Sequence, residues 1–143
     1  MDRTPPFDLP LAALPDCVFR TDLSLRLQAV SPAAVGMFGI PAAALVGAPL
    51  ADLVTADDHA RLQELVRQTL GQTDRTVSLL HQIRVRHADG RLIPVELHSR
   101  LLLDDHGEPV GVVGVARDLT ARLRQDAAAR EREHRRLQEQ KHA

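Results

Sequence analysis

Histidine and cysteine are the side chains of this sequence that could bind a metal or act as nucleophiles. The chain holds seven histidines and one cysteine, Cys17. A zinc site needs three or four ligands from suitably spaced positions, and the histidines show no such clustering. A glycine-rich phosphate loop, a nucleophile elbow and a zinc-hydrolase motif are also missing from the sequence. We therefore predict a non-catalytic domain without a metal site.

His81 is the histidine whose position suggests a binding role. It lies in segment 76–87, where apolar residues occupy odd positions, so its side chain is expected on their face. There it could contact a small ligand in a cavity between a sheet and its helices. The alternative is a core histidine bonded to the backbone. Four other cavity candidates share this apolar environment: Leu62, Leu79, Ile83 and Leu97.

Two further reactive side chains have ordinary structural explanations. His59 follows Asp57 and Asp58 at the start of a predicted helix, so we expect it to be solvated. Cys17 lies on the first predicted strand, where it is expected to be a small buried hydrophobic residue. A redox switch at Cys17 is the alternative.

Composition limits the class of protein. The chain has 143 residues, 44% hydrophobic and 26% charged, which suits one domain with an appendage. Only 2% are aromatic, and all of these are phenylalanine, which disfavours a base-stacking surface for nucleic acid. No apolar run approaches 18 residues and no charged-then-apolar leader is present, so we expect a cytoplasmic protein that does not bind membranes.

Short elements are predicted in the first half. Segments 18–23 and 26–30 suggest a hairpin. Two short helices follow, with Ser31 as the expected N-cap of the first, and Gly39 and Gly47 end them. After a turn over 49–54, Thr55 and the acidic residues behind it predict a longer helix that ends at Gly71.

Three strands are predicted in the second half, over 76–87, 91–103 and 110–116. The turn at 88–90 has Gly90 in a left-handed position and closes a three-residue hairpin. It sets Val85 opposite Ile93 and Ile83 opposite Val95, so both apolar sets share one face. The last strand is apolar on both parities, which favours a central place. The whole pattern predicts an α+β fold, a five-stranded antiparallel sheet with short helices on one face.

The other face of this sheet is polar, with leucines between. It carries Gln82, Arg84, Arg86, Glu96, His98 and Arg100, interrupted by Leu80, Leu92 and Leu102. A cross-strand polar ladder explains the charges. The alternative is a dimer surface, covered by the N-terminal arm or by a second subunit.

A helix of about 20 residues is predicted from Thr120, its expected N-cap, to the end of the chain. Residues 1–120 carry a net charge of −4 and residues 121–143 a net charge of +3, which marks a boundary here. Acidic residues are interspersed among the basic ones, so we do not expect nucleic-acid binding. A heptad pattern is weak, and a coiled coil stays an open alternative.

Six segments in this order resemble a PAS domain. They are LPDCVFRTDL (14–23), VSPAAVGMFGI (30–40), ALVGAPLADLV (44–54), TADDHARL (55–62), VRHADGRLIPVEL (85–97) and GEPVGVVGVARDLT (107–120). The resemblance implies an N-terminal arm over 1–13, a PAS domain over 14–120 and a helical linker over 121–143.

The resemblance also implies a sensory or dimerisation module. It would form a homodimer and relay a signal through its C-terminal helix to an effector, a histidine kinase or a cyclic-dinucleotide enzyme. Asp118, Leu119 and Thr120 match the family motif that couples the last strand to this helix.

Members of the family bind haem, flavin, carboxylates or nothing. Flavin photosensors carry a reactive cysteine in the stretch that matches 47–54, and this sequence has none there. Haem sensors carry a histidine on the long helix, where this chain has only His59, in its first turn. We predict no cofactor; a haem- or small-ligand-binding gas or redox sensor that uses His59 or His81 is the alternative.

Overall fold

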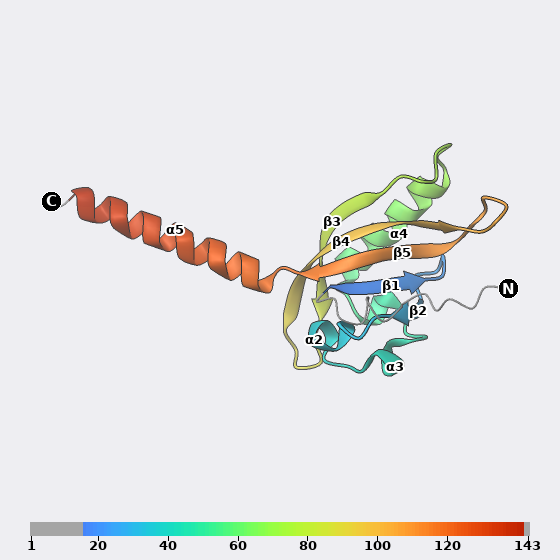
Figure 1. Cartoon of the computed structure of the whole chain (residues 1–143), viewed down its shortest axis with the longest axis horizontal. Helices are drawn as coiled ribbons and strands as arrows, with labels where there is room; N and C mark the ends of the chain where they lie inside the picture. The colour runs from blue at the N-terminus through green and yellow to red at the C-terminus, as the bar shows by residue number, and fades with distance from the viewer. Residues whose placement is uncertain (1–15, 142–143) are drawn as a thin grey trace.

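The computed structural model describes residues 16–141 of the chain (Figure 1). The predicted N-terminal arm, residues 1–13, lies outside these residues. The elements are β1 (Cys17–Thr21), β2 (Leu27–Val30), α2 (Ala34–Phe38), α3 (Ala42–Leu45), the 3-10 turn η1 (Leu50–Asp52), α4 (Ala56–Leu70), β3 (Leu79–Arg86), β4 (Leu92–Leu103), β5 (Pro109–Asp118) and α5 (Thr120–Lys141).

The five strands form one antiparallel sheet in the order β2-β1-β5-β4-β3. β5 is central, as its two-sided apolar pattern predicts. The β3–β4 register pairs Ile83 with Val95 and Val85 with Ile93, which confirms the register deduced from the turn. Gly90 has φ +95°, the left-handed conformation that this hairpin needs.

The short helices and α4 cover one face of the sheet, which we call the inner face (Figure 1). Buried aliphatic side chains from the strands pack there against α2, α3 and α4 and form the core. α5 leaves the end of β5 and projects away from the sheet. No helix within residues 16–141 is both long enough and apolar enough to span a bilayer.

Two local predictions are wrong. Ser31 does not cap α2, whose N-cap residue is Ala33; its buried hydroxyl instead accepts a hydrogen bond from Val18 N at 2.9 Å. β3 begins at Leu79 rather than at residue 76. Before it, the Asp74 carboxylate accepts a hydrogen bond from Thr76 N at 2.9 Å, which holds these residues in a turn.

Candidate ligand cavity and signal junction

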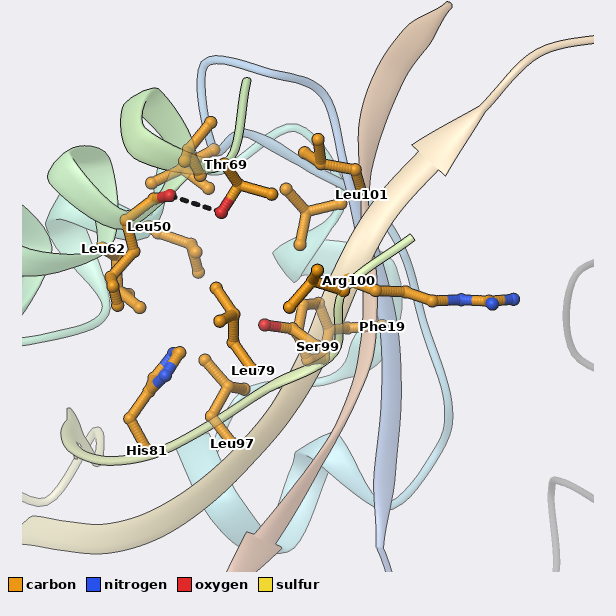
Figure 2. Close-up of a pocket in the computed structure, with 15 residues that line it drawn as sticks. Phe19, Leu50, Leu62, Thr69, Leu79, His81, Leu97, Ser99, Arg100 and Leu101 are labelled. Atoms are coloured by element: carbon orange, nitrogen blue, oxygen red, sulfur yellow. Dashed lines mark hydrogen bonds between the residues drawn. The ribbon is translucent and has the colours of Figure 1, made fainter. Parts of the chain in front are cut away.

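A cavity of about 40 Å³ lies between α4 and the inner face of the sheet (Figure 2). This volume has room for about three water molecules. Aliphatic side chains dominate its walls, and among the described residues that line it Phe19 supplies the one phenyl ring. The lining includes three of the predicted cavity residues together with His81: Leu62, Leu79 and Leu97.

Polar groups enter this cavity from both sides. In Figure 2 the His81 ring and the Ser99 hydroxyl point inward from β3 and β4. Thr69, on α4, donates its hydroxyl to Leu65 O at 2.7 Å and is already satisfied. The buried Nε2 of His81 has no hydrogen-bond partner among the residues that the structure describes. An unpartnered polar atom of this kind is unfavourable, so a water or ligand atom would be stabilised beside it.

His81 is held in its neutral form. Burial lowers the pKa of the imidazole, and the positive charge of Arg61 lowers it further. At neutral pH the ring therefore offers one donor and one acceptor and carries no charge. The cavity is suited to an uncharged molecule rather than to an anion.

A second cavity of about 40 Å³ lies beside the first, and Phe19, Leu50 and Leu97 line both. Its walls are apolar, and they include Cys17 and the predicted residue Ile83. Burial raises the pKa of the Cys17 thiol to about 11, so the reactive thiolate is scarce at neutral pH.

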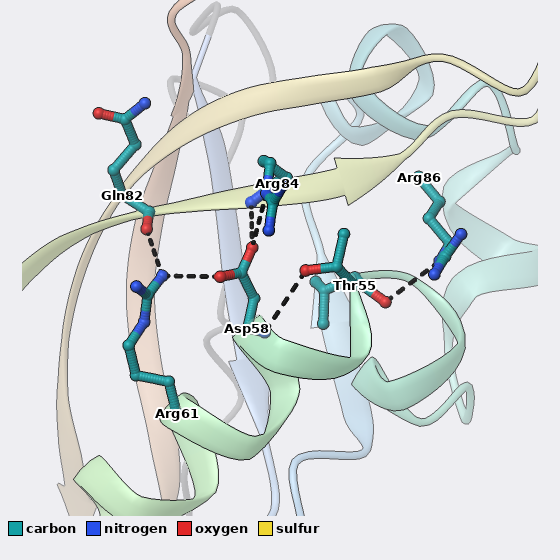
Figure 3. A network of polar contacts seen from close by, with 7 residues as sticks. Thr55, Asp58, Arg61, Gln82, Arg84 and Arg86 are labelled. Carbon is teal, nitrogen blue, oxygen red and sulfur yellow. Dashed lines mark hydrogen bonds and ion pairs between the residues drawn. The ribbon is translucent and has the colours of Figure 1, made fainter.

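The start of α4 is bonded to the outer edge of β3 (Figure 3). The Asp58 side chain is 6% exposed; its Oδ2 accepts a hydrogen bond from Arg84 N at 2.8 Å and its Oδ1 one from Arg61 Nη2 at 2.8 Å. Arg61 also donates to Gln82 O at 2.6 Å. Thr55 caps the helix, with its hydroxyl 3.4 Å from Asp58 N, as predicted. These contacts fix α4, one wall of the first cavity, to the strand that carries His81.

The junction between β5 and α5 lies where the central strand of the sheet ends, at Asp118 to Thr120. The side chain of Leu119 is buried, and its N–H donates to Pro94 O at 2.9 Å. The Asp118 carboxylate accepts a hydrogen bond from Thr120 N at 2.8 Å. Within residues 16–141 the buried Thr120 hydroxyl has no partner, and Thr120 is already the first residue of α5, so the prediction that Thr120 caps the helix is wrong. Asp118, the last residue of β5, instead reaches forward two residues and satisfies the N–H of the first helical residue, as in an Asx turn.

Within the described residues, no group of three histidine, cysteine or acidic side chains could hold a metal ion. His59 lines neither of the two inner cavities. A haem, a far larger group than three waters, does not fit either cavity as it stands.

A family model described as the PAS fold matches residues 11–124. The chain belongs to the PAS family. Its predicted resemblance and fold class are thereby confirmed. A search of curated protein sequences found no match.

Solved PAS structures share this fold at low sequence identity. A PAS domain from Colwellia psychrerythraea has a TM-score of 0.66 and 20% identity, over 76% of this chain and 89% of that one. A domain of a sensory box sensor histidine kinase/response regulator from Geobacter sulfurreducens gives 0.59 and 22%, over 74% and 85%. A sensory box histidine kinase/response regulator from Burkholderia thailandensis gives 0.61 and 22%, over 90% and 95%.

The predicted cavity residues all line cavities of the PAS fold, but they are distributed over two neighbouring cavities. His81, Leu62, Leu79 and Leu97 line the first cavity, and Ile83 lines the second. Ser99 was missed, although it has the same parity as Leu97 on β4 and so the same face.

Proposed function

We propose that this PAS domain is a non-catalytic sensory module of a cytoplasmic signalling protein. A change at the cavity is relayed through α5 to an effector, a histidine kinase or a cyclic-dinucleotide enzyme. The observation that carries the proposal is the junction at Leu119. Its buried side chain and its bond to Pro94 O join α5 to β4, the strand that also carries Leu97 and Ser99 of the cavity. The solved histidine-kinase PAS domains of the same fold support the choice of effector.

The relay is tested by changing the rotational phase of α5. The chain is fused through α5 to the catalytic region of a histidine kinase, and one to seven residues are inserted after Ala128. We expect autophosphorylation to vary with the period of an α-helix, about 3.6 residues, because each insertion rotates the effector by about 100°. Activity that depends only on linker length, or does not change, would refute the relay.

We also propose that the first cavity binds a small uncharged molecule with an alkyl body and one hydroxyl, carbonyl or amide group. The unpartnered Nε2 of His81 supports this, as do the inward hydroxyl of Ser99 and the aliphatic walls. The chemistry is tested by melting the protein with 1-propanol, propionamide or propionate at matched concentrations. Each uncharged probe should raise the Tm of the wild type more than it raises the Tm of a His81→Leu variant. Propionate should show no such difference between the two proteins. Equal effects on both proteins would contradict the site.

The predicted homodimer is retained as part of the proposed function. Two copies would place two cavities and two α5 helices in one signalling unit.

A further inference from the structure

The two inner cavities are separated by three side chains. Phe19, Leu50 and Leu97 line both cavities and so form the partition between them. Figure 2 shows Leu50 on the helix side of the first cavity and Phe19 on the sheet side. Phe19 and Leu97 are held in place, because β1 and β4 each have a neighbouring strand on both sides. Leu50 begins η1, a 3-10 turn of three residues, whose hydrogen-bond geometry is poorer than that of an α-helix. Leu50 is therefore the member of the partition that moves most readily.

The second cavity is apolar and enclosed. Among the described residues that line it, every one except Leu50 is buried. The groups there are hydrocarbon apart from the sulfur atoms of Cys17 and Met37. The inward polar groups of His81 and Ser99 belong to the first cavity, whose lining is partly exposed. A molecule that occupies both cavities therefore enters through the first and has one orientation, with its polar end beside His81 and its tail toward Cys17.

The volumes set the length of such a molecule. Each cavity is about 40 Å³, room for about three water molecules. A methylene group is about as large as a water molecule, so a chain of about three or four non-hydrogen atoms fills the first cavity, and one of about six or seven fills both. An empty apolar cavity forfeits dispersion contacts with its own walls. A chain long enough to reach the second cavity restores these contacts and gains affinity.

We propose that the two cavities form one elongated binding site for a linear, uncharged amphiphile of about six carbons with a hydroxyl, carbonyl or amide group at one end. The polar end lies beside His81 and Ser99. The chain passes between Phe19 and Leu50, and its terminal methyl group lies near Cys17. This inference rests on the proposed function and deepens it, because it defines the length, shape and orientation of the ligand.

The partition selects for shape as well as for length. Displacement of the Leu50 side chain opens a passage for a single methylene chain. A branched end is wider, and Phe19 and Leu97 cannot retreat from it without moving the strands that carry them. A branched molecule is consequently confined to the first cavity, even when it has as many carbons as a linear one.

The site is tested by NMR titration of the full chain with linear primary alcohols from 1-propanol to 1-octanol. We expect the affinity to rise about threefold to fourfold for each added CH₂ group up to about 1-hexanol and to level off beyond it. The control for general hydrophobicity is 3,3-dimethyl-1-butanol, a branched isomer of 1-hexanol, which should bind no more tightly than 1-butanol. Labelling of the methionine methyl groups locates the tail, because Met37 lines the second cavity. Its signal should shift with 1-hexanol and not with 1-propanol.

A variant that fills the second cavity provides an independent measurement. Ala116 is buried and lines the second cavity but not the first. Ala116→Val removes space for about two methylene groups, so the ratio of 1-hexanol affinity to 1-propanol affinity should fall about tenfold. Ala29→Val is the matched control, the same substitution on a strand at a position that lines neither of these cavities. It should leave the ratio unchanged.

Two results would overturn the inference directly: a Met37 signal that does not respond to 1-hexanol, or equal affinities for 1-hexanol and its branched isomer. Binding of 1-propanol that depends on His81 but gains nothing with chain length would also overturn it, and would leave the proposed ligand site in the first cavity intact. If none of the alcohols binds, the proposed site and this extension of it both fail. The two failures are thus distinguishable.

Discussion

Removal of the Asp58 carboxylate should destabilise the domain far more than removal of its neighbour Asp57. Asp58 accepts hydrogen bonds from the backbone N–H of Arg84 and from the Arg61 guanidinium. In Asp58→Ala the Arg84 N–H loses its acceptor at a partly buried position, which costs about 1–3 kcal/mol. Arg61 is 51% exposed and returns to water, so its loss adds little. We expect a fall of about 2 kcal/mol in the free energy of unfolding.

The control is Asp57→Ala. Asp57 occupies the same first turn of α4, is exposed, and changes the charge near the helix N-terminus equally. Both variants should lose the favourable interaction with the helix dipole, roughly 0.5 kcal/mol. Urea denaturation at pH 7 measures both. Equal losses in the two variants would refute the role assigned to the Asp58 network.

The pH dependence of this difference has a defined sign. Burial of Asp58 opposes ionisation, but the Arg84 N–H, Thr55 and the charges of Arg61 and Arg84 outweigh it and hold the pKa of the carboxyl below its usual value. A lowered native pKa stabilises the fold above the unfolded pKa of about 4, and this stabilisation is lost as the pH falls through the native pKa. The gap between wild type and Asp58→Ala should therefore narrow as the pH drops below about 4. A constant gap would contradict the ionised network.

Three other perturbations have defined outcomes. Asp118→Ala should lower the local free energy of opening at the start of α5 by about 1 kcal/mol and so raise the amide hydrogen-exchange rate there about fivefold. Thr120→Ala should leave this rate unchanged. The reverse pattern would restore Thr120 as the cap. Cys17 is buried, and burial raises the pKa of its thiol to about 11, so it should react with a thiol reagent at pH 8 far more slowly in the folded protein than in denaturant; rapid labelling of the folded protein would contradict this. Gly39→Ala should lower stability by about 1–2 kcal/mol in denaturant melts, since Gly39 has φ +71° and an added Cβ would lie 2.5 Å from the His87 ring; Gly36→Ala, with open space around it, is the control.

The sequence was most informative where one physical rule decides the structure. The left-handed Gly90 and the odd-numbered apolar residues had to agree on a single register, and they placed Ile83 opposite Val95, as observed. The same parity could have added Ser99 to the cavity, but a serine between leucines carries no apolar signal.

Polar side chains were harder to place, because several acceptors compete for each donor. Ser31 and Thr120 both look like N-caps by type and position. In the structure the Ser31 hydroxyl accepts a hydrogen bond from Val18 N. At the start of α5 it is the Asp118 carboxylate that accepts a hydrogen bond, from Thr120 N. The Asp58 network could not be predicted, since it depends on how closely α4 approaches β3, two elements whose bonded residues Asp58 and Arg84 lie 26 positions apart.

The contacts between α4 and β3 also govern which associations are open to this protein. The terminal strand of a sheet normally exposes a row of free N–H and C=O groups that can template another strand. Here the Arg61 guanidinium donates to Gln82 O, and the Asp58 carboxylate accepts from Arg84 N. The backbone N–H of Thr55 donates to Arg84 O. Leu53 O accepts from Arg86 N. With these groups occupied, the β3 edge of the sheet is protected against strand addition and the aggregation that follows from it. An intact molecule would therefore associate through the sheet face turned away from α4, or through α5, rather than by extending the sheet past β3.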